Sequence, residues 1–258
     1  MRYCLFDAPG PRLGLLRGND YVLDVEAIDK RLAGTDLMTL AGDEDAQRRL
    51  DKVGRGQPPQ GTLRRVDRAR FLPPVNTGRV VLVGGVQRDF VPTNLVGAGG
   101  HLDAAPEGSE GGAGWATGVG AVIRHHVHDV GDDWMEHLLG FAPLHVSGDQ
   151  VALGPWIVGT DEVRNPLDMA FSAFLDDEPV IRPAKALLDW QGELARANEA
   201  RALRAGDVVA LAAPGGDGQG HVRSALVYNG TVLARLEADV GVVAAPPPAA
   251  VAAAEPEA

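Results

Sequence analysis

Glycine and proline interrupt this chain so often that long regular elements are excluded. The 258 residues include 33 Gly and 18 Pro, which together are 51 of 258 positions. Every apolar run is broken by Gly, Pro or a charge within roughly ten positions, whereas a membrane-spanning helix needs about 18 consecutive apolar residues. Aromatic residues make up only 5% of the chain. This profile predicts a turn-rich protein of many short strands and no helical bundle.

The charge balance and the cysteine content restrict the partners and the compartment. With 24 Lys and Arg against 35 Asp and Glu, the net charge is −11, which argues against a nucleic acid or an anionic membrane as partner. The arginines between Arg64 and Arg70 are interleaved with other residues and indicate a solvated face. Cys4 is the single cysteine, no leader-like segment opens the chain, and we therefore expect a cytoplasmic protein with Cys4 in its core.

The chain divides into a small first unit, a larger second unit and a tail. Three short strands are expected in the first unit, at residues 2–6, 13–16 and 21–25. A helical stretch near residues 32–50 completes an N-terminal domain over residues 1–70. The second domain is expected over residues 71–243. Residues 244–258 hold eight Ala and four Pro and are predicted to be a disordered tail.

Strand signals dominate the second unit. Its first strand, residues 79–85, is a continuous apolar run bounded by glycines, as in a buried strand. Further strands are expected at residues 119–123, 156–158, 170–175, 208–211, 222–227 and 232–236. The pair Asn229-Gly230 predicts a tight hairpin between the last two. One long helix is expected from Pro183 to Arg201, with an apolar stripe of Leu187, Trp190, Leu194 and Ala197.

Common catalytic and cofactor motifs are absent from the sequence. There is no dinucleotide-binding fingerprint, no phosphate-binding loop and no Gly-x-Ser-x-Gly elbow. A histidine-rich run remains, in which His126 and His128 would face the same way on a strand and could hold a metal with Asp129. The competing interpretation is a solvated strand end without further ligands.

Three segments in a fixed order resemble the fumarylacetoacetate hydrolase family. They run from Arg79 to Phe90, from Leu153 to Asp168, and from Ala205 to Gly215, and the Leu-Gly-Pro-Trp-Ile-Val sequence at 153–158 is the most specific part. The resemblance covers about residues 71–243. It implies an α+β, mainly β fold, in which a small N-terminal domain precedes an antiparallel β-roll, and it implies a homodimer.

The resemblance also implies a metal site whose ligands this sequence lacks. Family members hold Mg²⁺ or Mn²⁺ with three carboxylates, because hard cations prefer oxygen ligands. Ala116 and Gly118 stand where two glutamates belong, and the third segment reads Ala142 to Ser147 without an acid. Phe90 and Thr93 replace the catalytic His and its Glu partner. We therefore expect no metal, no other cofactor and no family-type hydrolysis.

The leading hypothesis is a repurposed, metal-independent enzyme. Its cleft would bind a larger apolar specialised metabolite and would promote a cyclisation, isomerisation or similar rearrangement by orientation. The expected pocket residues are Phe90, Trp115, Ala116, Gly118, Leu211 and Pro214. His145, Arg88 and Asp89 are the candidate catalytic groups. The competing interpretations make Asp89 a helix cap and His145 a solvated loop residue.

Two alternatives come from other functional classes. The first is a non-catalytic binding protein or pseudoenzyme subunit, either a homodimer or a heterodimer with an intact paralogue. The second is a metal-dependent hydrolase or decarboxylase of a β-dicarbonyl acid, with His126, His128 and Glu110 as substitute ligands. In each case the expected ligand is a small molecule.

Overall fold

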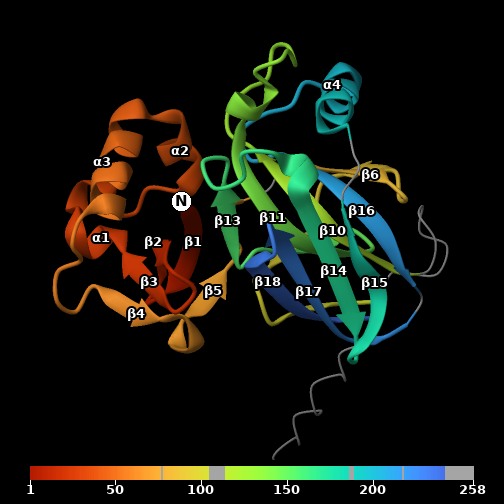
Figure 1. Ribbon diagram of the computed structural model, residues 1–258, viewed down its shortest axis with the longest axis horizontal. Coiled ribbons are helices and arrows are strands. Elements are labelled where there is room, and N and C mark those ends of the chain that lie inside the picture. Colours follow the sequence, from red (N-terminus) through yellow and green to blue (C-terminus); the bar gives the residue numbers. More distant parts are fainter. Residues whose placement is uncertain (77, 105–113, 186–188, 217, 242–258) are drawn as a thin grey trace, which may run out of the picture.

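The computed structural model describes residues 1–76, 78–104, 114–185, 189–216 and 218–241, so the proposed tail at 244–258 lies outside it. Figure 1 shows a small N-terminal lobe beside a larger β-rich lobe. The strands are β1 Arg2–Asp7, β2 Pro11–Arg17, β3 Tyr21–Asp24, β4 Leu63–Arg65, β5 Arg70–Leu72, β6 Val80–Gly84, β7 Arg88–Phe90, β8 Asn94–Val96, β9 Gly100–Leu102, β10 Trp115–Ile123, β11 Leu138–Ser147, β12 Gln150–Leu153, β13 Trp156–Gly159, β14 Met169–Leu175, β15 Glu178–Lys185, β16 Val208–Gly216, β17 Gly220–Tyr228 and β18 Thr231–Val240. The α-helices are α1 Val25–Ile28, α2 Leu37–Gly42, α3 Glu44–Arg55 and α4 Trp190–Ala200, and no helix of the described ranges is long and apolar enough to cross a membrane.

The N-terminal lobe is a β-meander covered by helices. Its three expected strands are confirmed as β1, β2 and β3, which pair antiparallel in chain order. The helical stretch expected near 32–50 consists of two helices, because α2 ends at Gly42 and α3 begins at Glu44. Asp43 separates them, since its carboxylate accepts hydrogen bonds from the backbone N–H groups of Asp45 (2.9 Å) and Ala46 (3.2 Å).

One continuous sheet connects the two lobes. β1 pairs antiparallel with β13 of the larger lobe, with Tyr3 opposite Ile157. The order through this 13-stranded sheet is β4-β3-β2-β1-β13-β11-β10-β16-β6-β7, with β5, β8 and β12 paired off this path. β5 covers the expected domain boundary at residue 70 and returns to pair with β1. The lobes are therefore joined by backbone hydrogen bonds as well as by the chain.

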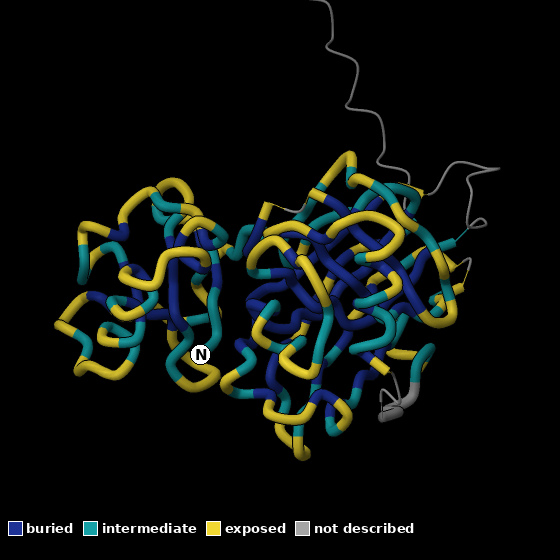
Figure 2. Tube along the Cα trace, turned by 90° about the horizontal axis from the view of Figure 1, so that it is seen from above, coloured by how far each residue is buried: buried dark blue, intermediate teal, exposed yellow. Residues whose placement is uncertain are grey.

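A second sheet of five strands forms the other layer of the larger lobe. Its strand order is β15-β14-β17-β18-β9. A buried apolar cluster fills the space between the two sheets, with Phe141 from the larger sheet and Phe171 and Leu226 from the smaller one. A second cluster covers the opposite face of the larger sheet, where Leu40 of α2 and Leu50 of α3 pack. Figure 2 shows the buried segments concentrated inside the larger lobe and in the centre of the smaller one.

The hairpin expected at Asn229-Gly230 is confirmed, with φ of 49° and 78° at the two central residues. The helix expected from Pro183 is wrong in its first part, because β15 extends to Lys185 and α4 begins only at Trp190. Asp189 caps α4 by accepting a hydrogen bond from the N–H of Gly192 (2.9 Å). Trp190, Leu194 and Ala197 are buried as expected, whereas Leu187 lies outside the described residues.

Candidate functional site

The expected cleft centres on β10, which lies between β11 and β16 in the larger sheet. All nine of its residues, Trp115–Ile123, are buried. Ala116 lies opposite Val146 of β11 and Pro214 of β16, and Gly118 lies opposite Leu144 and Ala212. Because paired residues share a face of a sheet, these side chains point to the same side. Ala116, Val146 and Ala212 belong to one buried cluster, against which Phe90 packs.

The remaining expected pocket residues point to the opposite face of the sheet. Trp115 and Thr117 alternate with Ala116 along β10, and Leu211 packs against the cluster between the two sheets. The indole nitrogen of Trp115 is buried without a hydrogen-bond partner in the described chain. The structure therefore places Ala116, Gly118 and Pro214 beside one another on β10 and β16, and Trp115 and Leu211 on the other side of the sheet. Phe90 lies opposite Val80 at the edge of the sheet and packs against the same extended cluster as Ala116.

The residues at the implied metal position do not fit a metal ion. Ala116 carries no donor atom, and Gly118 has no room for a side chain, since a Cβ there would lie 1.8 Å from the carbonyl oxygen of Leu211. Among the described ranges no group of three or more His, Cys, Asp or Glu side chains is arranged to hold a metal. Within the part of the chain that the structure describes, no other group of side chains replaces the missing carboxylates.

This close approach predicts that Gly118 tolerates no other residue. Gly118→Ala should destabilise the protein by about 3 kcal/mol, because either β10 or β16 must shift to admit the methyl group. The matched control is Gly42→Ala, where an added Cβ meets no atom within 4 Å and the stability should stay within about 1 kcal/mol. Urea unfolding measures the free energy of unfolding of both variants. Equal values would contradict the close approach of β10 and β16 at Gly118.

His145 is a buried strand residue, so the alternative of a solvated loop histidine is wrong. It lies in β11 opposite Thr117 and is fully buried. Its Nδ1 lies 2.8 Å from the Thr117 hydroxyl, and its Nε2 lies 3.4 Å from the Ser224 hydroxyl of the smaller sheet. Burial lowers the pKa of His145 to about 4, partly offset by a hydrogen bond to the backbone of Leu236. The ring is therefore neutral at pH 7 and links the two sheets.

The buried neutral imidazole makes stability depend on pH. The unfolded state takes up a proton near pH 6.5, whereas the folded state does so only near pH 4, so stability falls as the pH drops through this window. Between pH 7.5 and pH 5 the loss from this group should be about 2 kcal/mol. The His145→Gln variant lacks this titrating group. The difference in unfolding free energy between wild type and variant should therefore be about 2 kcal/mol smaller at pH 5 than at pH 7.5. A difference independent of pH would contradict the assignment.

Arg88 and Asp89 lie on β7 and have structural partners. Asp89 accepts a hydrogen bond from Nε of the buried Arg79 (2.7 Å), which lowers the pKa of Asp89, so Asp89 does not cap a helix. Arg88 donates to the carbonyl of Gly148, and its guanidinium lies 4.5 Å over the ring of Phe90. Both residues line a groove of about 280 Å³ against α4, apart from His145.

The histidine-rich run forms two pairs on the surface. The rings of His126 and His128 meet edge to face with their centroids 4.7 Å apart. Nε2 of His125 lies 2.9 Å from Nδ1 of His137. Asp129 lies in the loop that follows β10, where its carboxylate accepts a hydrogen bond from the backbone N–H of Val130. Glu110 lies outside the described residues, so its distance from these rings is undefined.

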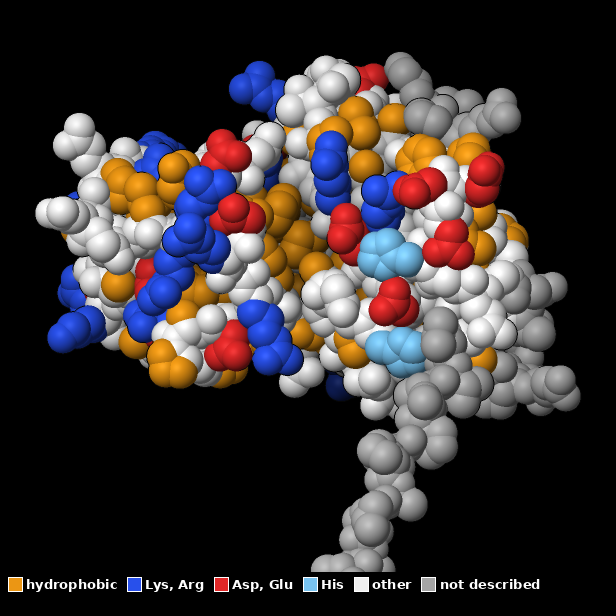
Figure 3. All heavy atoms as spheres, turned by 90° about the horizontal axis from the view of Figure 1, so that it is seen from below, with side chains coloured by type: hydrophobic (Ala, Val, Ile, Leu, Met, Phe, Trp, Pro, Cys, Tyr) orange, Lys and Arg blue, Asp and Glu red, His pale blue; other side chains and the backbone are white. Residues whose placement is uncertain are grey.

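A groove between the lobes was not anticipated from the sequence. It has a volume of about 600 Å³, and the apolar side chains of Phe71, Trp156, Leu233 and Ala98 line it beside the charged Arg235. Figure 3 shows apolar side chains gathered in the cleft between the two lobes. Its walls come from β5, β13 and β18, which are distant in sequence and meet only in the folded chain.

Comparison with solved structures identifies the architecture. The chain superposes on maleylpyruvate hydrolase from Sphingobium sp. SYK-6 with a TM-score of 0.70 at 19% identity, covering 93% of this chain and 99% of that one. It superposes on fumarylacetoacetate hydrolase from Exiguobacterium antarcticum with a TM-score of 0.69 at 16% identity, covering 94% and 100%. This chain has the fumarylacetoacetate hydrolase fold.

The same fold occurs in 2-hydroxyhepta-2,4-diene-1,7-dioate isomerase from Mycobacterium marinum, with a TM-score of 0.64, 15% identity and coverage of 93% and 98%. No family model matches the sequence, and no curated protein matches it. The expected α+β, mainly β fold with a fumarylacetoacetate-hydrolase-like roll is confirmed by the structure and these neighbours. The identities are too low to transfer an activity.

Proposed function

We propose that this chain is a metal-independent binding protein built on the fumarylacetoacetate hydrolase fold. Its ligand is an amphipathic small molecule with a largely apolar body. The groove between the lobes carries this proposal. Its volume of about 600 Å³ lies within the range of roughly 300 to 1,000 Å³ that is usual for ligand pockets. The metal-dependent hydrolysis implied by the family resemblance has no support in the side chains at 116 and 118.

The walls of the groove are held rigidly. The rings of Phe71 and Trp156 meet edge to face with centroids 5.6 Å apart, and the indole N–H of Trp156 donates to the carbonyl of Leu233 (2.8 Å). Leu233 and Ala98 extend the apolar surface, whereas Arg70, Arg235 and Glu237 supply charges of both signs. This combination favours a ligand with an apolar body and one polar end.

Manganese and pyruvate occupy a crystal structure of the maleylpyruvate hydrolase neighbour, which is 22% identical to this chain. Ala116 and Gly118 could not bind the metal in that way, because neither has a ligand atom in its side chain. The ligand of this chain is therefore proposed to be larger and less charged than a β-dicarbonyl acid. The structural neighbours support the scaffold only.

Filling the groove tests this proposal. Ala98→Trp should weaken binding of 1-anilinonaphthalene-8-sulfonate, an aromatic amphiphile, by about tenfold or more, because the indole would occupy the ligand volume. Val91→Trp is the control, because Val91 is exposed and does not line the groove. Fluorescence titration gives both affinities. Unchanged affinity in folded Ala98→Trp would exclude the groove as the site.

A metal-free rearrangement at the expected cleft is the second candidate. The observation that favours it is the half-buried Phe90, which lies under the Arg88 guanidinium and packs against the cluster containing Ala116. A cation over an aromatic ring beside an apolar wall could stabilise charge in a bound metabolite. His145 and Asp89 are not brought to this place, so orientation would have to supply most of the catalysis.

Replacing Phe90 by His tests this second candidate function. Phe90→His should not produce acylpyruvate hydrolysis, because a base without a metal lacks the oxyanion stabilisation that dominates such barriers. Spectrophotometric assay with an acylpyruvate measures this, with Phe90→Leu as the control for ring loss. Hydrolysis by Phe90→His alone would contradict both candidate functions.

The assembly and the location remain proposals. A homodimer, or a heterodimer with a paralogue that keeps the metal carboxylates, is compatible with a binding subunit. The expectation of a cytoplasmic protein rests on the single cysteine Cys4, whose side chain is fully buried.

A further inference from the structure

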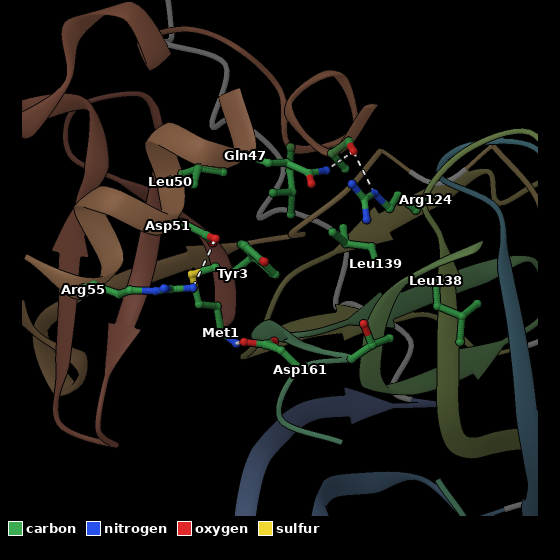
Figure 4. A pocket seen from close by; sticks show the side chains of 13 residues that line it. Met1, Tyr3, Gln47, Leu50, Asp51, Arg55, Arg124, Leu138, Leu139 and Asp161 are labelled. Atoms are coloured by element: carbon green, nitrogen blue, oxygen red, sulfur yellow. Dashed lines mark hydrogen bonds and ion pairs between the residues drawn. The ribbon is translucent and has the colours of Figure 1, made fainter. Parts of the chain in front are cut away.

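A polar pocket lies at the junction of the lobes, at the other end of β10 from the expected cleft. It has a volume of about 250 Å³ and lies between helices α2 and α3 and the ends of β1, β10 and β11. Figure 4 shows Tyr3, Gln47 and Arg124 around it, with Leu50, Leu138 and Leu139 among the lining side chains. Ala116 and Gly118 do not line this pocket.

Arg124 is the unbalanced charge of the pocket. Its Nε donates to the carbonyl of Ala41 (2.8 Å), which fixes the guanidinium across the junction. No carboxylate of the described chain lies within ion-pair distance of it. The side chain is half-buried, so a positive charge with free terminal N–H groups is held at the pocket. A half-buried, unpaired guanidinium is a strong site for a carboxylate.

Tyr3 supplies a second donor. Burial, and then the nearby Asp161 and Asp51, raise the pKa of the Tyr3 hydroxyl far above its ordinary value, so the phenol stays protonated at neutral pH. No described group accepts a hydrogen bond from it. The hydroxyl is therefore available to a ligand in the pocket.

The acidic side chains of the pocket have cationic partners. Asp51 pairs with Arg55 at 3.4 Å, and Asp161 pairs with the amino group of Met1. Among the described residues that line the pocket, the guanidinium of Arg124 therefore remains without a counter-ion. Leu50 and Leu139 are buried in the same cluster and offer an apolar wall to the pocket.

We propose that this pocket binds a small aliphatic carboxylate. The carboxylate would accept hydrogen bonds from the terminal N–H groups of Arg124 and from the Tyr3 hydroxyl, and the alkyl body would lie on the leucines. The volume admits an acid of about six carbons and is small for a drug-sized ligand. This site is independent of the groove between the lobes, with which it shares no lining residue.

The test compares 4-methylpentanoate with 4-methylpentan-1-ol, which has the same carbon skeleton without the charge. Ligand-observed NMR titration of the wild type should give a dissociation constant of about 1 mM for the acid and at least about tenfold weaker binding of the alcohol. Tyr3→Phe removes only the hydroxyl and should weaken binding of the acid about threefold to tenfold. Arg124→Gln should weaken it by about tenfold or more.

Arg48→Gln is the matched control, because Arg48 is exposed and lies outside the pocket. Circular dichroism checks that each variant is folded, and Tyr3→Phe carries the test if Arg124→Gln unfolds. Equal affinities for the acid and the alcohol would overturn the proposal, and so would no binding of the acid up to about 20 mM. Unchanged affinity for the acid in folded Tyr3→Phe and Arg124→Gln would overturn it as well. Ala98→Trp should leave acid binding unchanged, which separates this site from the proposed function.

Discussion

The burial of β10 on both faces is the constraint on which the rest of the structure depends. This strand lies between β11 and β16, with one apolar cluster on each side of the sheet. A strand buried on both faces excludes unpaired charges, because an isolated carboxylate in such a place is costly to desolvate. Ala116 and Gly118 satisfy this condition, and two glutamates would not unless a metal paired with them. The close approach of β10 and β16 at Gly118 likewise leaves no room there for a side chain.

The same sheet explains where ligands can bind. β1 extends it into the N-terminal lobe through its pairing with β13, so the two lobes meet along a junction that is fixed by backbone hydrogen bonds. The apolar groove beside Trp156 and the polar pocket beside Arg124 both lie along this junction. Recognition is therefore proposed to have moved from the centre of the sheet to the boundary of the lobes.

The sequence predicted the strands and turns whose signals are local. Asn229-Gly230 specifies its hairpin by positive φ, and the apolar run before Gly84 specifies a buried strand. The candidate site was predicted less well. Trp115 and Ala116 are adjacent in a strand and could not share a face, which the alternation of side chains already implied. The groove between the lobes could not be predicted from the sequence, because Phe71 and Trp156 meet only through long-range strand pairing.

We propose that this chain has no divalent metal site at Ala116 and Gly118. Electron paramagnetic resonance of Mn²⁺ titrated into the purified protein tests it most directly, because free and bound Mn²⁺ give separate signals. We expect the free signal to rise in proportion to added Mn²⁺, with no stoichiometric loss, because the side chains of Ala116 and Gly118 offer no ligand atoms. Loss of one equivalent of the free Mn²⁺ signal, which excess Mg²⁺ restores by displacing the bound ion, would contradict this expectation.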